Sequence, residues 1–246
     1  MDGSGLGNVL DALSSIRPLT PDEIARSRGF EANLQIEAVY ASNALDGNVL
    51  TLDETAGIIR SGLAAGGKPL RDQLEAIEHI EALRYIDELI ASSSELTSRP
   101  LREIHAMATR RSRPELAGRY RTVPVVPAGG DYTPPDAVFV PESIDGLLAD
   151  YASRRDAEHP VILAADLHQG IVDIRPFEHG NGRTARLAMN LHLMQNGYPL
   201  TIIYPEDRDH YEDAIVQTRN TNAPHAFRLF LIDSVRRSLE RYLNAL

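Results

Sequence analysis

A glycine-rich loop between two helix-forming segments is the strongest constraint on this chain. Residues 160–174 are apolar on most helical faces, so this helix belongs at the centre of a domain. The chain then turns at Pro176 and becomes helix-forming again after Gly180-Asn181-Gly182. The two glycines can take positive φ and turn successive N–H groups inward, and a helix N-terminus favours anions. The sequence therefore predicts an anion-binding loop at the mouth of the most buried pair of helices.

Two arginines strengthen this interpretation. Arg183 and Arg186 are three residues apart and share a helix face, where two guanidiniums can hold one phosphate chain by forked hydrogen bonds. The alternative is a glycine turn that opens an ordinary helix, with both arginines in solvent. Gly-x-Gly alone favours that alternative, whereas Asn181 and two in-phase arginines favour phosphate. The predicted phosphate-binding residues are Gly180, Asn181, Gly182, Arg183 and Arg186.

The composition is that of an ordinary globular protein. The 246 residues are 43% hydrophobic and 24% charged, and their formal net charge is −10. We expect neither nucleic acid nor a membrane as the main partner, although a local basic site can form in an acidic chain. The lack of cysteine excludes disulfides and thiolate chemistry. The polar first residues do not resemble a signal peptide, so we expect a cytoplasmic protein.

Helical periodicity runs through most of the chain, so the predicted fold class is all-α. Residues 1–19 are expected to form a flexible lead and residues 20–246 a single domain. Besides the helices around the loop, helices are predicted from Pro21 to a glycine cap at Gly47, from a capping box at Thr51, and over residues 69–92, 101–109, 142–154, 209–218 and 227–246. The acidic residues of segment 69–92 are expected to form a solvated face: Glu75, Glu78, Glu81, Asp87 and Glu88. His105 and His168 are interpreted as structural.

The segment 118–141 differs in composition from the rest. It is rich in Val, Pro, Gly and Tyr, and two short extended runs flank Gly129-Gly130. Pro124 and Pro127 restrict these runs. The pattern predicts a small, irregular β-hairpin.

The central loop resembles that of a known family. Pro176-Phe177-x-x-Gly180-Asn181-Gly182-Arg183-x-x-Arg186 is similar to the signature of the Fic (Fido) domain, the fold of protein AMP-transferases, which reads His-Pro-Phe-x-Asp/Glu-Gly-Asn-Gly-Arg-x-x-Arg. The chain departs from it at two positions: Arg175 stands at the catalytic histidine and His179 at the metal-binding carboxylate. The resemblance spans about residues 30–240 and implies a helical Fic fold, with ATP or another nucleotide as ligand.

A second resemblance lies in the helix of about residues 31–46. Ser42-Asn43-Ala44-Leu45-Asp46-Gly47 is similar to the inhibitory motif of Fic proteins, Ser/Thr-x-x-x-Glu-Gly/Asn. In the family the glutamate reaches the second arginine of the loop and keeps the ATP γ-phosphate away from it. The resemblance implies a pair between Asp46 and Arg186, weakened or bridged by water because aspartate is one methylene shorter. The alternative is that Asp46 only precedes a capping glycine.

The predicted hairpin is the third point of resemblance. Gly118-x-x-Arg121 and Asp131-Tyr132-Thr133 are similar to the Fic flap, which holds a target peptide by strand pairing. The resemblance therefore implies a protein target at the flap. A hairpin that only covers the core is an equally good interpretation.

The two substitutions affect the chemistry that the family implies. In the family the histidine takes the proton of a target hydroxyl, which attacks the α-phosphate of ATP. Arg175 cannot do this, because a guanidinium stays charged. Mg²⁺ prefers oxygen ligands, so His179 is a poor replacement, although Glu178 could take its place. A Mg²⁺ site is therefore left open.

Three functions remain: a binder of nucleotide or another phosphorylated ligand in which Arg175 adds a third cation, an AMP-transferase with a substitute base such as His179, or an enzyme that acts on a small phosphorylated or acidic molecule. Loss or alteration of AMP transfer is the favoured interpretation. Tyr204, Arg208 and Tyr211 are weaker candidates for an adenine pocket. The sequence leaves open whether the chain is a monomer or a homodimer.

Overall fold

The computed structural model describes residues 21–126, 132–220 and 225–245, with side chains from residue 29 onward. Helices are the regular structure of these residues, which confirms the predicted all-α class. Their bounds are α2 (Pro21–Leu45), α3 (Leu52–Ser61), α4 (Leu70–Ala91), α5 (Ser98–Met107), η1 (Ala137–Phe139), α6 (Val140–Arg154), α7 (Pro160–Ile174), α8 (Asn181–Gln195), η2 (Pro205–Asp207), α9 (Arg208–Asn220) and α10 (His225–Ala245).

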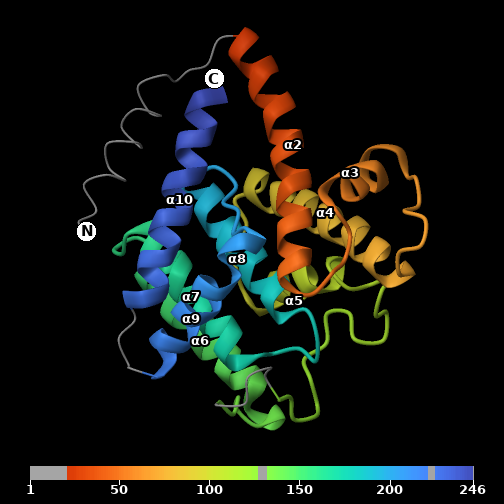
Figure 1. Ribbon diagram of the computed structural model, residues 1–246. Coiled ribbons are helices and arrows are strands. Elements are labelled where there is room, and N and C mark those ends of the chain that lie inside the picture. Colours follow the sequence, from red (N-terminus) through yellow and green to blue (C-terminus); the bar gives the residue numbers. More distant parts are fainter. Residues whose placement is uncertain (1–20, 127–131, 221–224, 246) are drawn as a thin grey trace.

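The helices α7 and α8 form the centre of the molecule (Figure 1). One apolar cluster packs on the side of α2, α4, α5 and α6, and a second packs on the side of α9 and α10. Leu167 and Ile171 of α7 belong to the first cluster, and Val161 and Ala165 belong to the second. A helix buried on two sides needs apolar residues on most faces, which is the pattern that residues 160–174 carry.

The long helix α2 runs beside α10 (Figure 1). The pair is joined by an edge-to-face contact between Phe30 and Tyr242, with 6.0 Å between ring centroids, and by an ion pair of 2.9 Å between Arg241 and Glu37. These contacts anchor the first half of α2. Its C-terminal end is therefore presented at a fixed place, against the N-terminus of α8.

The turn after α2 is fixed to α4. Asn48 donates a hydrogen bond of 3.0 Å to the carbonyl of Asp72, and the Val49 N–H donates one of 2.9 Å to the carboxylate of Asp72. The predicted capping box follows, because Thr51 accepts from the N–H of Glu54 and the Glu54 carboxylate accepts from the N–H of Thr51. The end of α2 is thus held from both sides.

The predicted β-hairpin flap is not supported, because residues 118–126 and 132–141 contain no strand. Arg121 holds the two arms instead: its buried guanidinium donates to the carbonyls of Val123 and Pro135, and also to that of Arg175 at 2.7 Å. Pro124 has no N–H to give to a strand ladder, so side-chain hydrogen bonds replace backbone pairing. Gly129, Gly130 and Asp131 lie outside the described residues.

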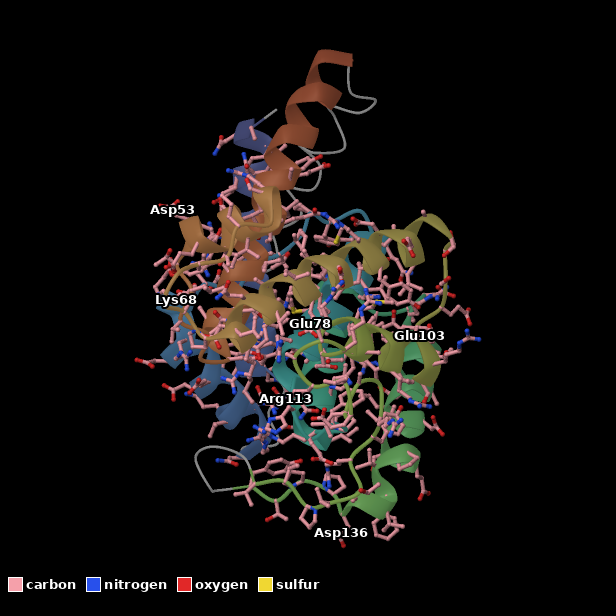
Figure 2. All side chains as sticks on the ribbon, turned by 90° about the vertical axis from the view of Figure 1, so that its right-hand side faces the viewer. Asp53, Lys68, Glu78, Glu103, Arg113 and Asp136 are labelled. Carbon is pink, nitrogen blue, oxygen red and sulfur yellow. The ribbon has the colours of Figure 1, made fainter. Side chains whose placement is uncertain are left out.

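The acidic residues of α4 do not all lie on a solvated face. Glu78 is fully buried and Glu75 is only 8% exposed, whereas Asp87 and Glu88 are exposed as predicted. Figure 2 shows Glu78 near the middle of the molecule, while Asp53 lies at its edge. A buried carboxylate needs partners: those of Glu75 belong to the site described below, and Glu78 accepts hydrogen bonds from the loop after α5.

Among the helices of the described segments, none is both long enough and apolar enough to cross a bilayer.

Candidate functional site

The loop between α7 and α8 is built from two left-handed residues. Arg175 ends α7 with φ 46°, and its N–H donates to the carbonyl of Ile171 at 3.0 Å. Gly180 begins α8 with φ 74°. Gly182 was expected to share this freedom, but it lies inside α8 with helical φ. Its small size matters for another reason, because the Asp46 carboxylate approaches to 2.9 Å from where a Cβ would stand.

Buried side chains hold the loop in this shape. The amide of Asn181 donates to the Phe177 carbonyl at 2.7 Å and accepts from the Phe177 N–H at 2.9 Å. Phe177 stacks on the His105 ring with 3.6 Å between centroids. His105 accepts from the N–H of Gly118 at 3.0 Å, so its other ring nitrogen carries the proton and donates to the carbonyl of His179 at 3.1 Å. The side chains of Asn181 and His105 therefore support the loop.

The second arginine of the loop is paired with the end of α2. Arg186 is 5% exposed, and its guanidinium donates to the hydroxyl and the carbonyl of Ser42, both at 2.8 Å. It also forms an ion pair of 3.0 Å with Asp46. The predicted pair between Asp46 and Arg186 is therefore formed. The contact is direct, which corrects the expectation of a water between the two side chains.

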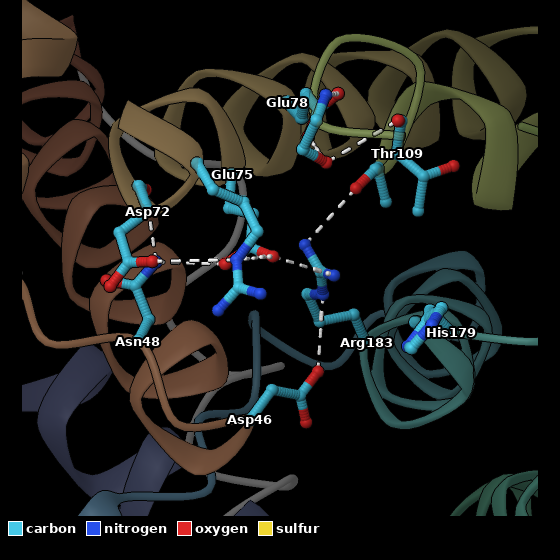
Figure 3. A network of polar contacts seen from close by, with 12 residues as sticks. Asp46, Asn48, Asp72, Glu75, Glu78, Thr109, His179 and Arg183 are labelled. Carbon is cyan, nitrogen blue, oxygen red and sulfur yellow. Dashed lines mark hydrogen bonds and ion pairs between the residues drawn. The ribbon is translucent and has the colours of Figure 1, made fainter. Parts of the chain in front are cut away.

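The first arginine shares the same carboxylate. Arg183 is 4% exposed, and its Nε lies 3.2 Å from the second oxygen of Asp46 (Figure 3). Glu75 of α4 lies 3.4 Å from a terminal nitrogen of Arg183, and the carbonyl of Ala108 accepts from the other at 3.3 Å. Asn48 donates to the second oxygen of Glu75 at 3.1 Å. Arg183 is thus held between two carboxylates from different helices.

The opposite charges of this cluster stabilise one another in their ionised forms. Burial raises the pKa of Asp46, but Arg186 and Arg183 outweigh it and hold the pKa below its usual value. Burial lowers the pKa of Arg186, whereas Asp46 and Tyr211 raise it above the usual value. Asp46 is accordingly an ionised group whose single negative charge is shared by two buried cations, although its own side chain remains 29% exposed.

These groups line a cleft of about 710 Å³, a volume typical of small-molecule sites. Seven arginines line it: Arg71, Arg113, Arg175, Arg183, Arg186, Arg208 and Arg219. Four carboxylates face them: Asp46, Glu75, Glu178 and Glu212. In a chain with a net charge of −10, this excess of cations concentrates positive charge in one concave place.

The predicted catalytic positions Arg175, Glu178 and His179 all line the same cleft. Arg175 is half-buried, and its Nε has no hydrogen-bond partner among the described residues. Burial and the neighbouring Arg219 lower the pKa of Arg175. Burial and Arg113 lower the pKa of His179, so its exposed ring is neutral near pH 7. In the described part of the chain, no group of three or more His, Cys, Asp or Glu side chains is arranged for a metal ion.

The other candidates divide between the cleft and its surroundings. Tyr132 lies under Arg219, 4.1 Å from ring centroid to guanidinium, and its hydroxyl donates to the carbonyl of Asp173. Thr133 is exposed, and Asp131 lies outside the described residues. Arg208 and Tyr211 line the cleft, whereas Tyr204 does not and packs against Arg241 instead.

Sequence reasoning missed five charged residues of the cleft: Arg71, Glu75, Arg113, Glu212 and Arg219. Glu75 has a signal in the sequence, because it directly follows Leu74 of the apolar stripe. The other four have none, since charged side chains in helices and loops are most often solvated.

Comparison with known proteins identifies the architecture. Residues 95–193, which include the whole loop, match the model of the Fic/DOC family. The chain contains a Fic/DOC domain. It is 35% identical over 211 residues to the protein adenylyltransferase Fic of Nematostella vectensis, which covers 83% of this chain and 48% of that protein. The corresponding protein of Culex quinquefasciatus is 32% identical over 239 residues, covering 95% and 46%.

Solved Fic structures have the same fold. A Fic domain-containing signaling protein of Bacteroides thetaiotaomicron superposes with a TM-score of 0.88 at 28% identity, covering 98% of this chain and 96% of that one. Fic-1 of C. elegans superposes with a TM-score of 0.86 at 29% identity, covering 99% and 71%. The chain spans about half the length of the curated relatives it matches.

Proposed function

We propose that the cleft binds the phosphate groups of a nucleotide or another phosphorylated ligand, and that the AMP transfer of Fic proteins is lost or altered in this chain. The relatives are protein adenylyltransferases, which implies ATP as the natural first ligand to test.

One observation carries the binding proposal: Asp46 occupies two buried arginines at once, at 3.0 Å and 3.2 Å. Two guanidiniums converging on one carboxylate form a site for an anion, and phosphate offers the same acceptor geometry with more charge. The buried Nε of Arg175 lacks a hydrogen-bond partner among the described residues, and the Nε of Arg183 faces Asp46 in an ion pair without hydrogen-bond geometry. These donors favour a ligand with several acceptor oxygens.

The resemblance assigns the base position to Arg175 and the metal position to His179. A guanidinium remains protonated even where burial lowers its pKa, so Arg175 would bind an anion and would not remove a proton. Glu178 also lines the cleft and would supply an oxygen ligand if Mg²⁺ accompanies the phosphates. The loss of a general base alone costs roughly 10²–10⁴-fold in rate.

A specific observation favours one alternative, an AMP-transferase with a substitute base. The ring of His179 is exposed in the cleft and its lowered pKa leaves it able to accept a proton at neutral pH. In that case His179 would take the proton of a target hydroxyl in place of the family's histidine.

Binding is tested by titrating ATP into wild type, Asp46→Asn and Asp53→Asn. Asp46→Asn keeps the shape of the side chain and removes the charge that competes with phosphate, so ATP should bind roughly tenfold tighter or more. Asp53 is exposed on α3, so Asp53→Asn controls for the lost negative charge and should leave affinity unchanged. Equal affinities in all three proteins would reject the cleft as the phosphate site.

Transfer is tested with ATP labelled at the α-phosphate, in the presence of Mg²⁺. Wild type and Asp46→Asn should acquire no label, and Arg175→His with His179→Asp, built on Asp46→Asn, should label itself. Label on the wild type that disappears in His179→Gln would favour the substitute-base alternative. Binding of other phosphorylated metabolites without any nucleotide binding would identify a repurposed small-molecule site.

A further inference from the structure

Residues 110–113, in the loop after α5, include three arginines whose side chains do not face the same way. Arg110 and Arg111 both form ion pairs with Glu81 of α4, where all three side chains are partly exposed. Arg113 forms no ion pair with any described residue, and it lines the cleft. Arg110 and Arg111 thus share one counter-charge outside the cleft, whereas Arg113 brings into the cleft a cation without an ion-pair partner among the described residues.

A buried carboxylate fixes this arrangement. Glu78 of α4 is fully buried and accepts from the N–H groups of Arg111 and Ser112 and, at 2.7 Å, from the Ser112 hydroxyl. The Arg113 N–H donates to the carbonyl of Thr109 at 2.8 Å. Figures 2 and 3 show Glu78 on α4, beside the loop that it holds. Hydrogen bonds therefore hold the backbone on either side of Arg113, and its side chain lines the cleft.

Arg113 has an unfilled bonding capacity. Its Nε is buried and has no hydrogen-bond partner in the described part of the chain. A buried donor without an acceptor is costly, and a ligand oxygen would relieve it. Arg71 lines the same cleft with a 56% exposed side chain and only distant contacts, 3.8 Å to Asp72 and 3.8 Å to Glu75.

We propose that Arg113, assisted by Arg71, forms a second anion subsite in the cleft, which takes a phosphate group separate from the one held by Arg183 and Arg186. This inference rests on the proposed binding function and deepens it: the ligand carries at least two phosphate groups. Asp46 contacts Arg183 and Arg186 but has no ion pair with Arg113 or Arg71. The second subsite is accordingly open while Asp46 is in place.

The loop offers a matched pair of variants for the test. Arg113→Gln and Arg111→Gln each remove one arginine from the same loop, the first inside the cleft and the second outside it. Inorganic phosphate, pyrophosphate, AMP and ATP are titrated into both variants and into wild type. We expect Arg113→Gln to bind pyrophosphate and ATP roughly ten- to a hundredfold more weakly than wild type, because one charge-assisted hydrogen bond is lost. Arg111→Gln should bind both with the wild-type affinity.

The probes separate the sources of the phosphate. If Arg113→Gln binds ATP more weakly than wild type but binds AMP equally well, Arg113 holds a distal phosphate of a nucleotide. If the variant binds pyrophosphate and inorganic phosphate more weakly but binds ATP equally well, Arg113 belongs to a site for free phosphate. Arg113→Lys, which keeps the charge without the forked geometry, should bind with intermediate affinity, and it serves as the test variant if Arg113→Gln does not fold.

Equal binding by Arg113→Gln and Arg111→Gln for every probe would overturn the second subsite, and so would a wild type that binds none of the probes. If Asp46→Asn still tightens ATP in the first case, the proposed function stands and only the second subsite is rejected.

Discussion

The Oδ1 atom of Asp46 lies 3.0 Å from a terminal nitrogen of Arg186, although 140 residues separate them in the sequence. The contact joins the end of α2 to the second turn of α8, and the other carboxylate oxygen reaches Arg183. One side chain therefore controls the charge of both loop arginines, and in the proposed function a phosphate competes with it.

This relationship predicts a coupling between stability and anion binding in Asp46→Asn. Without the carboxylate, two buried guanidiniums lose a counter-charge, and we expect a loss of about 1–3 kcal/mol in the free energy of unfolding. Saturating pyrophosphate should restore more stability to Asp46→Asn than to wild type, because the anion replaces the missing charge. Urea unfolding with and without pyrophosphate measures both. An equal gain in the two proteins contradicts the prediction.

A second prediction concerns pH. Burial, followed by the charges of Arg183 and Arg186, lowers the pKa of His79 to about 3 from an ordinary 6.5, and burial lowers that of His105 to about 3. The unfolded chain takes up these protons below about pH 6.5, whereas the folded protein does not until about pH 3. The free energy of unfolding should therefore decrease as the pH is lowered through this window, by up to about 1.4 kcal/mol per pH unit for each histidine.

His79→Leu isolates one share of that slope. The Nδ1 atom of His79 has no hydrogen-bond partner among the described residues, so replacing the ring leaves no polar group without its Nδ1 partner. Urea unfolding at several pH values from 7 to 5 should give a shallower fall for His79→Leu than for wild type. His225→Gln, a change at an exposed histidine, is the control and should keep the wild-type slope.

The third prediction contrasts two glutamates of α4. Glu75 faces Arg183 at 3.4 Å and accepts from Asn48, whereas Glu88 is exposed near the end of the helix. Glu75→Gln should cost about 1–3 kcal/mol of unfolding free energy, because a buried guanidinium loses one of its two counter-charges. Glu88→Gln should stay within about 0.5 kcal/mol of wild type. Similar losses of unfolding free energy in both variants would instead support the sequence-based prediction that the acidic residues of α4 form one solvated face.

The loop and the central helices were predictable because their signals are local. The apolar residues of segment 160–174 and the glycine at position 180 act through the helix that they form or begin, and the Thr51 capping box acts over four residues. The pair of Asp46 and Arg186 was reached through resemblance, since nothing local in residues 42–47 specifies a partner 140 residues away.

The errors arose where tertiary contacts decide the outcome. Glu75 and Glu78 follow a helical spacing typical of a solvated face, yet each has partners supplied by segments that are far away in the sequence: Arg183 for Glu75 and the loop at Ser112 for Glu78. Likewise, the arms of segment 118–141 have hairpin composition, but Arg121 takes the carbonyls that a strand ladder would use. Tertiary partners override a local pattern in each case.

The last prediction tests the close approach at Gly182. A Cβ at this position would lie 2.9 Å from Oδ1 of Asp46 and 3.0 Å from Nη1 of Arg186, closer than packed atoms normally come. Alanine normally stabilises a helix interior by roughly 0.5–1 kcal/mol over glycine. In Gly182→Ala the crowding should outweigh this gain and cost about 1–3 kcal/mol. Gly146→Ala in α6, where a Cβ meets nothing within 4 Å, should show the ordinary gain.

A double-mutant cycle with Asp46→Gly assigns the cost to its cause. Without the carboxylate, only Arg186 crowds the new methyl group, so Gly182→Ala should cost at least about 1 kcal/mol less in the Asp46→Gly background than in wild type. Urea unfolding of the four proteins gives the coupling. If the two changes in unfolding free energy are additive, Asp46 does not press against Gly182 in solution, and the close approach of Asp46 to the start of α8 is contradicted.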